Sequence, residues 1–212
     1  MSIITKIEEQ KNKSRVNVFV DGTFFCGLNK EVAVLFRLKE NKEVDEDRLK
    51  KAIFESEVKT AFEKSLNYLS RQMQTKKKLT DKLIQKGFSE ESIRQAVKKL
   101  EDYHYLDDRL YTKQFIQQNQ LKSKRILKQK LHEKGISKDV IDDILAEERV
   151  DDEYEICLIQ AKKYIKNKEI INSKDLQKFY ASLARKGFNF DVIKKAVKTA
   201  INKDLEDENN FD

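Results

Sequence analysis

The chain of 212 residues contains no proline, no tryptophan, five glycines and two cysteines. Because proline ends helices and glycine favours turns, this scarcity predicts a helix-rich chain with short connections. Cys26 and Cys157 lie far apart and form no spaced group with His104 or His132. A disulfide framework or a zinc site needs clustered ligands, so we expect no metal and no cofactor.

Long apolar segments are also missing from the sequence. No run of about 18 apolar residues occurs that could span a membrane. The first ten residues, MSIITKIEEQ, lack the apolar stretch of a signal peptide. We therefore expect a cytoplasmic protein that does not enter membranes, and we expect it to be a monomer.

The usual signatures of catalysis are absent as well. The sequence contains no GxxxxGK[ST], GxGxxG, HExxH or GxSxG motif. Asp107 and Asp108 are the best pair of carboxylates, but they stand directly before an amphipathic stretch. Capping of that helix is the simpler role for them. The sequence therefore predicts a protein that is not an enzyme.

What the chain does contain is one pattern that occurs three times, around Gly87, Gly135 and Gly187, which are 48 and 52 residues apart. Apolar residues recur eight and four positions before each glycine and one, six and ten positions after it, and a lysine precedes each glycine. The matching columns are Leu79, Leu127 and Phe179; Leu83, Leu131 and Leu183; Lys86, Lys134 and Lys186; Phe88, Ile136 and Phe188; Ile93, Ile141 and Ile193; and Val97, Leu145 and Val197. A fixed period of this length marks one supersecondary unit used repeatedly.

Each copy predicts a helix, a turn and a second helix. Apolar residues spaced by four lie on one helix face, and the glycine takes the left-handed conformation that ends the helix. Ser89, Ser137 and Asn189 are candidate N-caps of the helices that follow. Another amphipathic stretch precedes each pair, so we expect three helices per copy. The expected domains are an N-terminal region at 1–58, three-helix modules at 59–106, 107–149 and 150–204, and a frayed acidic tail at 205–212.

The N-terminal region has a different pattern. Val16, Val18 and Val20 alternate with other residues, which is typical of a strand. The Asp21-Gly22 pair fits a two-residue hairpin turn. With strands expected at 3–8 and 23–28, the sequence predicts a three-stranded meander, followed by helices at 30–37 and 47–70 that Asn29 and Asp45 cap. The predicted fold is thus mainly α: a tandem array of three three-helix modules after a small β-meander.

Basic residues are concentrated in two segments, although the net charge of the chain is only +7. Residues 71–86 carry six basic side chains and one acidic one, and residues 109–138 carry nine basic side chains and one acidic one. Like charges spaced by four destabilise a free helix, and an anionic partner offsets that cost. The alternative to a binding surface is a charged face that only keeps the protein soluble. The candidate binding residues are Arg71, Lys76, Lys77, Lys78, Lys82, Arg109, Lys113, Lys122, Lys124, Arg125, Lys128 and Lys130.

Several segments of the sequence resemble those of a known family. The run 68–73 (YLSRQM), the run 83–88 (LIQKGF) and the segment 105–109 (YLDDR) are similar to the RecX regulators of bacterial recombination, as is the segment 125–136. The resemblance covers about residues 60–200. The chain departs from the usual pattern at Lys78, where an acidic residue is common, and at 122–125, which lacks a common glycine.

The resemblance implies a non-enzymatic regulator that binds filaments of the RecA recombinase on DNA. Members of the family generally hinder strand exchange and coprotease activity, which places them in DNA repair, recombination and the SOS response, and many bind DNA. Two other interpretations remain open from the residues: a free-standing helical DNA-binding protein, because the helix–glycine–helix unit resembles a helix-turn-helix, and a scaffold for another protein.

Overall fold

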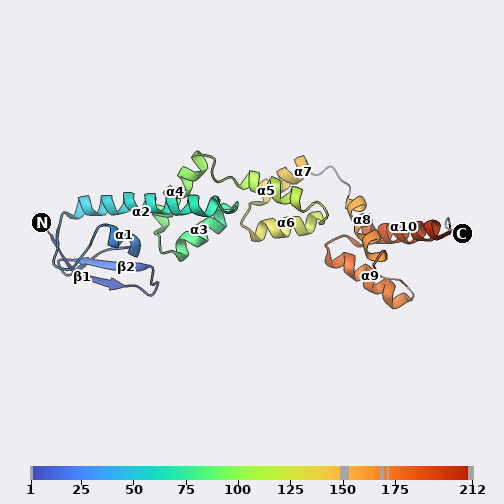
Figure 1. Cartoon of the computed structure of the whole chain (residues 1–212), viewed down its shortest axis with the longest axis horizontal. Coiled ribbons are helices and arrows are strands. Elements are labelled where there is room, and N and C mark those ends of the chain that lie inside the picture. The colour runs from blue at the N-terminus through green and yellow to red at the C-terminus, as the bar shows by residue number, and fades with distance from the viewer. Residues whose placement is uncertain (1, 149–152, 168–169, 171, 210–212) are drawn as a thin grey trace. The chain divides into compact units, whose positions relative to one another are not determined.

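The computed structural model describes residues 2–148, 153–167, 170 and 172–209, and the side chains among these up to Glu147 and from Glu153 to Asn202. It divides into two units, residues 1–108 and 109–212. Helices predominate in both, and a small sheet lies at the N-terminus (Figure 1). The predicted fold class is therefore confirmed.

The N-terminal sheet is antiparallel and has the strand order β3-β2-β1-β4. Its strands are β1 (Ser2–Glu9), β2 (Arg15–Val20), β3 (Thr23–Asn29) and β4 (Glu43–Val44). The β2–β3 turn has positive φ at Asp21 (49°) and Gly22 (78°), as the predicted two-residue turn requires. The meander is thus present, but it has four strands because Val44 pairs with Ser2. Strand β4 has only two residues, which is too short for a periodic pattern to predict it from the sequence.

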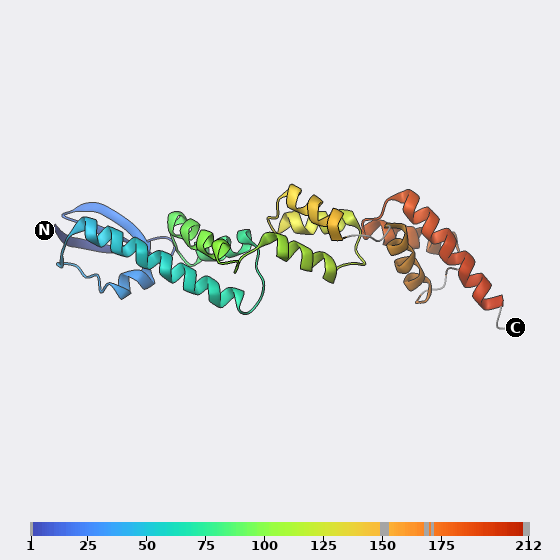
Figure 2. The ribbon, with the colours of Figure 1, turned by 90° about the horizontal axis from the view of Figure 1, so that it is seen from above.

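Helix α2 (Glu46–Leu69) joins the sheet to the first module. Helix α1 (Lys30–Leu35) and the start of α2 begin at the predicted caps, because the side chains of Asn29 and Asp45 accept hydrogen bonds from backbone N–H groups. Ile53 packs with the sheet core, whereas Val58 and Ala61, further along α2, belong to the core of the first module. One helix therefore contributes to two hydrophobic cores, and Figures 1 and 2 show α2 running as one long helix from the sheet to the helices of the first module.

The first module is completed by α3 (Lys76–Gln85) and α4 (Glu90–Asp102). Its predicted core columns are buried: Leu79 and Leu83 have no exposed surface. Ser89 caps α4 as expected, and Thr75 caps α3. Helix α4 ends at Asp102, and His104, two residues later, takes the left-handed conformation (φ 57°) that glycine takes elsewhere in the chain.

The second unit contains six helices: α5 (Asp108–Gln118), α6 (Lys124–Glu133), α7 (Lys138–Glu148), α8 (Glu153–Ile165), α9 (Ser173–Arg185) and α10 (Phe190–Asn209). The first three enclose one core around Leu127 and Leu131, and the last three enclose another around Phe179 and Leu183. Helix α10 extends to Asn209, into the segment expected to fray. The rest of that tail, and the expected boundary at 149–150, lie outside the described residues.

All three repeat glycines end helices as predicted. Gly87, Gly135 and Gly187 have φ of 81°, 86° and 90°. Each donates its backbone N–H to the carbonyl three residues earlier, at 2.9 Å. This geometry is the left-handed helix end that disfavours a residue with a Cβ atom.

Candidate functional site

The basic residues of the first unit divide into paired and unpaired groups. The Lys76 ammonium lies 2.8 Å from a Glu101 carboxylate oxygen. Lys82 lies over the ring of Tyr68, 4.7 Å from its centroid, and donates to the Gln74 amide oxygen. Arg71, Lys77 and Lys78 are exposed, and the described residues offer them no ion-pair partner. Among the candidate binding residues of this unit, these three therefore have no ion pair within the described part of the chain.

In the second unit, acidic residues of α7 neutralise much of the predicted basic surface. Arg109 pairs with Asp143 at 3.1 Å and with Glu147 at 3.3 Å. Lys128 lies 2.5 Å from Asp142, and this hydrogen bond holds the pKa of Asp142 below its ordinary value. The basic residues that cluster in the sequence are thus partly neutralised by acidic residues that the fold brings next to them.

Four further candidates lie on α5, α6 and the turn between them. Lys122 donates to the side-chain oxygen of Asn119, and desolvation, followed by the charge of Lys130, lowers the pKa of Lys122. Lys113 is exposed on α5. Lys124 and Lys130 are exposed on α6 without an ion-pair partner among the described residues. Lys124 and Lys130 are therefore candidates to meet an external anion.

Arg125 lies differently from its neighbours on α6. Its Nε donates to the Gly187 carbonyl at 3.3 Å, and its Nη2 is 3.5 Å from the Ala184 carbonyl. Ser123, the N-cap of α6, donates its hydroxyl to the Lys186 carbonyl at 2.9 Å. The guanidinium of Arg125 therefore binds the helix end at Gly187, a contact that sequence spacing did not indicate.

A similar contact occurs in the first unit, at Gly87. Asn29 donates its side-chain amide to the Lys86 carbonyl at 2.6 Å, and Arg15 donates Nη1 to the Gly87 carbonyl at 2.9 Å. In both units a neutral side chain and an arginine thus satisfy the carbonyls of a Lys-Gly turn. Helix ends leave such carbonyls without intrahelical partners.

The N-termini of α3 and α6 carry cations but no acidic residue in the first turn. Distant carboxylates compensate: the Lys76 N–H donates to Asp108 at 2.9 Å, and the Lys124 N–H donates to Glu153 at 3.3 Å. Asp108, which was expected to cap the helix that follows it, thus accepts a hydrogen bond at the start of α3, and burial is the main cause of its raised pKa. Because these carboxylates already occupy the helix ends, lysine side chains are what an external anion would meet.

A pocket of about 420 Å³ beside α2 contains Cys26, Glu57 and Ser89. Glu57 is buried and accepts hydrogen bonds from the Ser89 N–H at 3.1 Å and from the hydroxyls of Ser89 and Ser92 at 2.7 Å. Desolvation raises the pKa of Cys26 to about 11, so its thiol is protonated near neutral pH. These contacts give Glu57 a role in anchoring the start of α4.

Within the described residues, no group of three or more His, Cys, Asp or Glu side chains is placed to hold a metal ion. Among those same residues, none of the helices has the length and apolar character needed to cross a membrane.

Comparison with known proteins agrees with this architecture. The model of the regulatory protein RecX N-terminal domain matches residues 2–45, that of the first RecX three-helix domain matches residues 61–100, and that of the third matches residues 151–197. A crystal structure of regulatory protein RecX superposes with a TM-score of 0.59 at 29% identity, covering 92% of this chain and 100% of that one. A crystal structure of RecX from Lactobacillus salivarius has a TM-score of 0.60 at 26% identity and covers 68% of this chain and 97% of that one.

Relatives named regulatory protein RecX are similar over nearly the whole chain. The protein of Clostridioides difficile (strain 630) is 35% identical over 209 residues, which is 96% of this chain and 98% of that protein. The protein of Clostridium botulinum (strain Alaska E43 / Type E3) is 34% identical over 98% of this chain and 100% of its own length. The chain therefore belongs to the RecX family of regulatory proteins.

Proposed function

We propose that this protein is a non-enzymatic regulator that binds RecA–DNA filaments and lowers their recombinase and coprotease activity in DNA repair and recombination. Membership of a family whose proteins are named as regulators supports the class of function. The observation that carries the binding step is a set of lysines on two equivalent helices that have no ion-pair partner among the described residues: Lys77 and Lys78 on α3, and Lys124 and Lys130 on α6.

Repulsion between neighbouring basic side chains would be relieved by a partner of negative charge. Lys78 stands four residues before Lys82, and Lys130 stands four residues before Lys134, so like charges are neighbours on each helix of the free protein. Other cations of the chain, such as Arg109 and Lys128, are neutralised internally. An acidic groove of a protein filament, or the phosphates of its DNA, would supply the missing charge. The leucines of both helices face the core, so partner binding at the lysines leaves packing unchanged.

The test is co-sedimentation of the full chain with preformed RecA filaments, with bare single-stranded DNA and with bare duplex. The variants are Lys77→Glu/Lys78→Glu and Lys124→Glu/Lys130→Glu. The matched control is Lys50→Glu/Lys51→Glu on α2, which changes the same charge at exposed positions. We expect wild type to prefer filaments, both site variants to bind them less, and the control to bind as wild type does. Equal or better binding of wild type to bare DNA would instead support a free-standing DNA-binding protein.

A further inference from the structure

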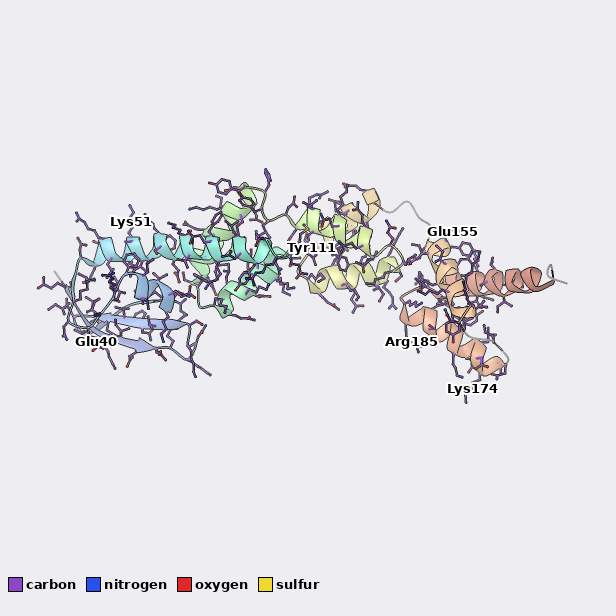
Figure 3. All side chains as sticks on the ribbon, in the orientation of Figure 1. Glu40, Lys51, Tyr111, Glu155, Lys174 and Arg185 are labelled. Atoms are coloured by element: carbon purple, nitrogen blue, oxygen red, sulfur yellow. The ribbon has the colours of Figure 1, made fainter. Side chains whose placement is uncertain are left out.

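The third module carries a concentrated positive charge that its overall balance conceals. Residues 149–212 contain 13 basic and 12 acidic side chains. Residues 156–167 and 176–186, however, contain six basic residues and no acidic one. These residues are Lys162, Lys163, Lys166, Lys178, Arg185 and Lys186. Most of them lie toward the C-terminal ends of α8 and α9, and Figure 3 labels Arg185 at that end of α9 and Lys174 at the other.

Where α8 and α9 face each other, their side chains enclose a pocket of about 280 Å³. Its lining is polar and cationic: Gln160, Lys163, Tyr164, Asn167, Ser182 and Lys186. The Tyr164 ring is fixed by stacking on Phe179, at 4.5 Å between centroids. All of the lining residues belong to the third module, and two of them, Gln160 and Lys186, also contact the turn at 121–123 through hydrogen bonds.

The ammonium of Lys186 is held in place by a neutral group. It donates to the Gln160 side-chain oxygen at 2.5 Å. Gln160 is itself only 9% exposed, and its amide donates to the Leu121 carbonyl at 3.2 Å. An amide orients the ammonium without cancelling its charge. Because an ammonium has three donors, this bond leaves further donors available to a ligand.

Lys163 places a second positive charge at the same pocket. It forms no ion pair with a described carboxylate, and its charge, after desolvation, contributes to the lowered pKa of Lys186. Cations near a helix C-terminus do complement the helix dipole. That role accounts for a lysine at each helix end, but it does not require two ammonium groups at one pocket whose lining also includes the Ser182 hydroxyl.

We propose that this pocket binds a phosphate group of a nucleic-acid backbone. Lysine binds phosphate as a point charge, and serine, tyrosine and asparagine side chains are common donors to backbone phosphates. A protein carboxylate would be matched better by the planar fork of arginine, which the pocket lacks. This inference rests on the proposed function in that DNA is part of the filament, and it adds a contact in the third module to those on α3 and α6.

The test measures binding of the full chain to a fluorescent single-stranded oligonucleotide by anisotropy at several salt concentrations. The variants are Lys163→Gln, which loses no hydrogen bond of the folded state, and Lys163→Gln/Lys186→Gln. The matched control is Lys194→Gln/Lys198→Gln, which removes two exposed lysines of α10 in the same module. Loss of this one phosphate contact predicts that the double variant lowers the slope of log affinity against log salt by about 0.7, and that the single variant lowers it by less. The control should keep the wild-type slope, and all variants should keep the wild-type circular dichroism spectrum.

Wild-type affinity and slope in both site variants would overturn the proposal. A second result would also overturn it: inorganic phosphate stabilises the wild type but not the double variant, and the two proteins bind the oligonucleotide with the same affinity. The pocket would then be a site for a small anion. Co-sedimentation with RecA filaments separates the two proposals. If wild type binds filaments but the site variants lose nothing on the oligonucleotide, only the phosphate site is wrong. If wild type ignores filaments while the site variants still lose oligonucleotide affinity, the phosphate site stands and the filament proposal is wrong.

Discussion

Gly87 is expected to be far less tolerant of a side chain than Gly22, although both have a positive φ near 80°. A Cβ atom added at Gly22 would meet nothing within 4 Å, so Gly22→Ala measures the left-handed backbone cost alone. That cost is about 1–2 kcal/mol. The fewer unfolded conformations of alanine offset about 0.4–1 kcal/mol of it.

At Gly87 the same substitution adds a steric conflict. The new Cβ would lie 2.8 Å from the Ser14 carbonyl oxygen and 2.9 Å from the Arg15 Cγ. The first of these is backbone, which cannot move aside without disturbing the strand that follows it. Overpacking of this kind costs about 1–3 kcal/mol. We therefore expect Gly87→Ala to lower the free energy of unfolding by about 1–3 kcal/mol more than Gly22→Ala does.

Urea denaturation of the full chain, followed by circular dichroism, gives both free energies. Hydrogen exchange of peptides from α3 and α4 reports whether the loss is located in the first module. Both glycines lie in the first unit, and we expect that unit to unfold in one cooperative transition in both variants. Costs that agree within about 0.5 kcal/mol would show that the close approach to Ser14 has no energetic weight, and the reasoning would fail.

Three further outcomes follow from the contacts described. Arg125→Gln should lower the stability of the second unit in urea by about 1 kcal/mol, because its hydrogen bonds to the Gly187 turn are lost, whereas Lys124→Gln should leave stability unchanged; equal effects would contradict the assignment. Because Lys128 depresses the pKa of Asp142, the stabilisation by this pair is present above the ordinary value of 3.8 and is lost as pH falls through the lower folded pKa. The melting temperatures of wild type and Asp142→Asn should therefore converge in acid, and a constant gap between them would argue against the pair. Burial raises the pKa of Cys157 to about 11, so a thiol reagent at pH 8 should modify it far more slowly in the native protein than in urea, and equal rates would contradict its burial.

The parts of the fold that sequence reasoning predicted are those that local spacing determines. Leu79, Leu127 and Leu183 are fully buried because residues spaced by four share a helix face. The glycine turns and the caps at Asn29 and Asp45 likewise depend on a few adjacent residues. Strand β4 escaped prediction because its two residues are specified by their partners in β1, not by a pattern of their own.

The candidate site was harder to predict, for a related physical reason. Sequence spacing located the basic helices, but whether a lysine is free depends on acidic residues brought in from elsewhere in the chain. Lys128 is neutralised by Asp142, whereas Lys124 and Lys130, on the same helix, have no such partner among the described residues. The pocket at Lys163 and Lys186 was missed because only the packing of α8 on α9 brings these side chains together.

Helix α2 also gives the first unit a mechanical property. Ile53 is anchored in the sheet core and Val58 in the core of the first module, so a single continuous helix spans both. A force applied to the sheet would be transmitted to the first module along the continuous backbone hydrogen bonds of this helix. The sheet and the first module are thus coupled through one rigid helix. A partner that binds β1–β3 and displaces the sheet would therefore also displace α3 and its lysines.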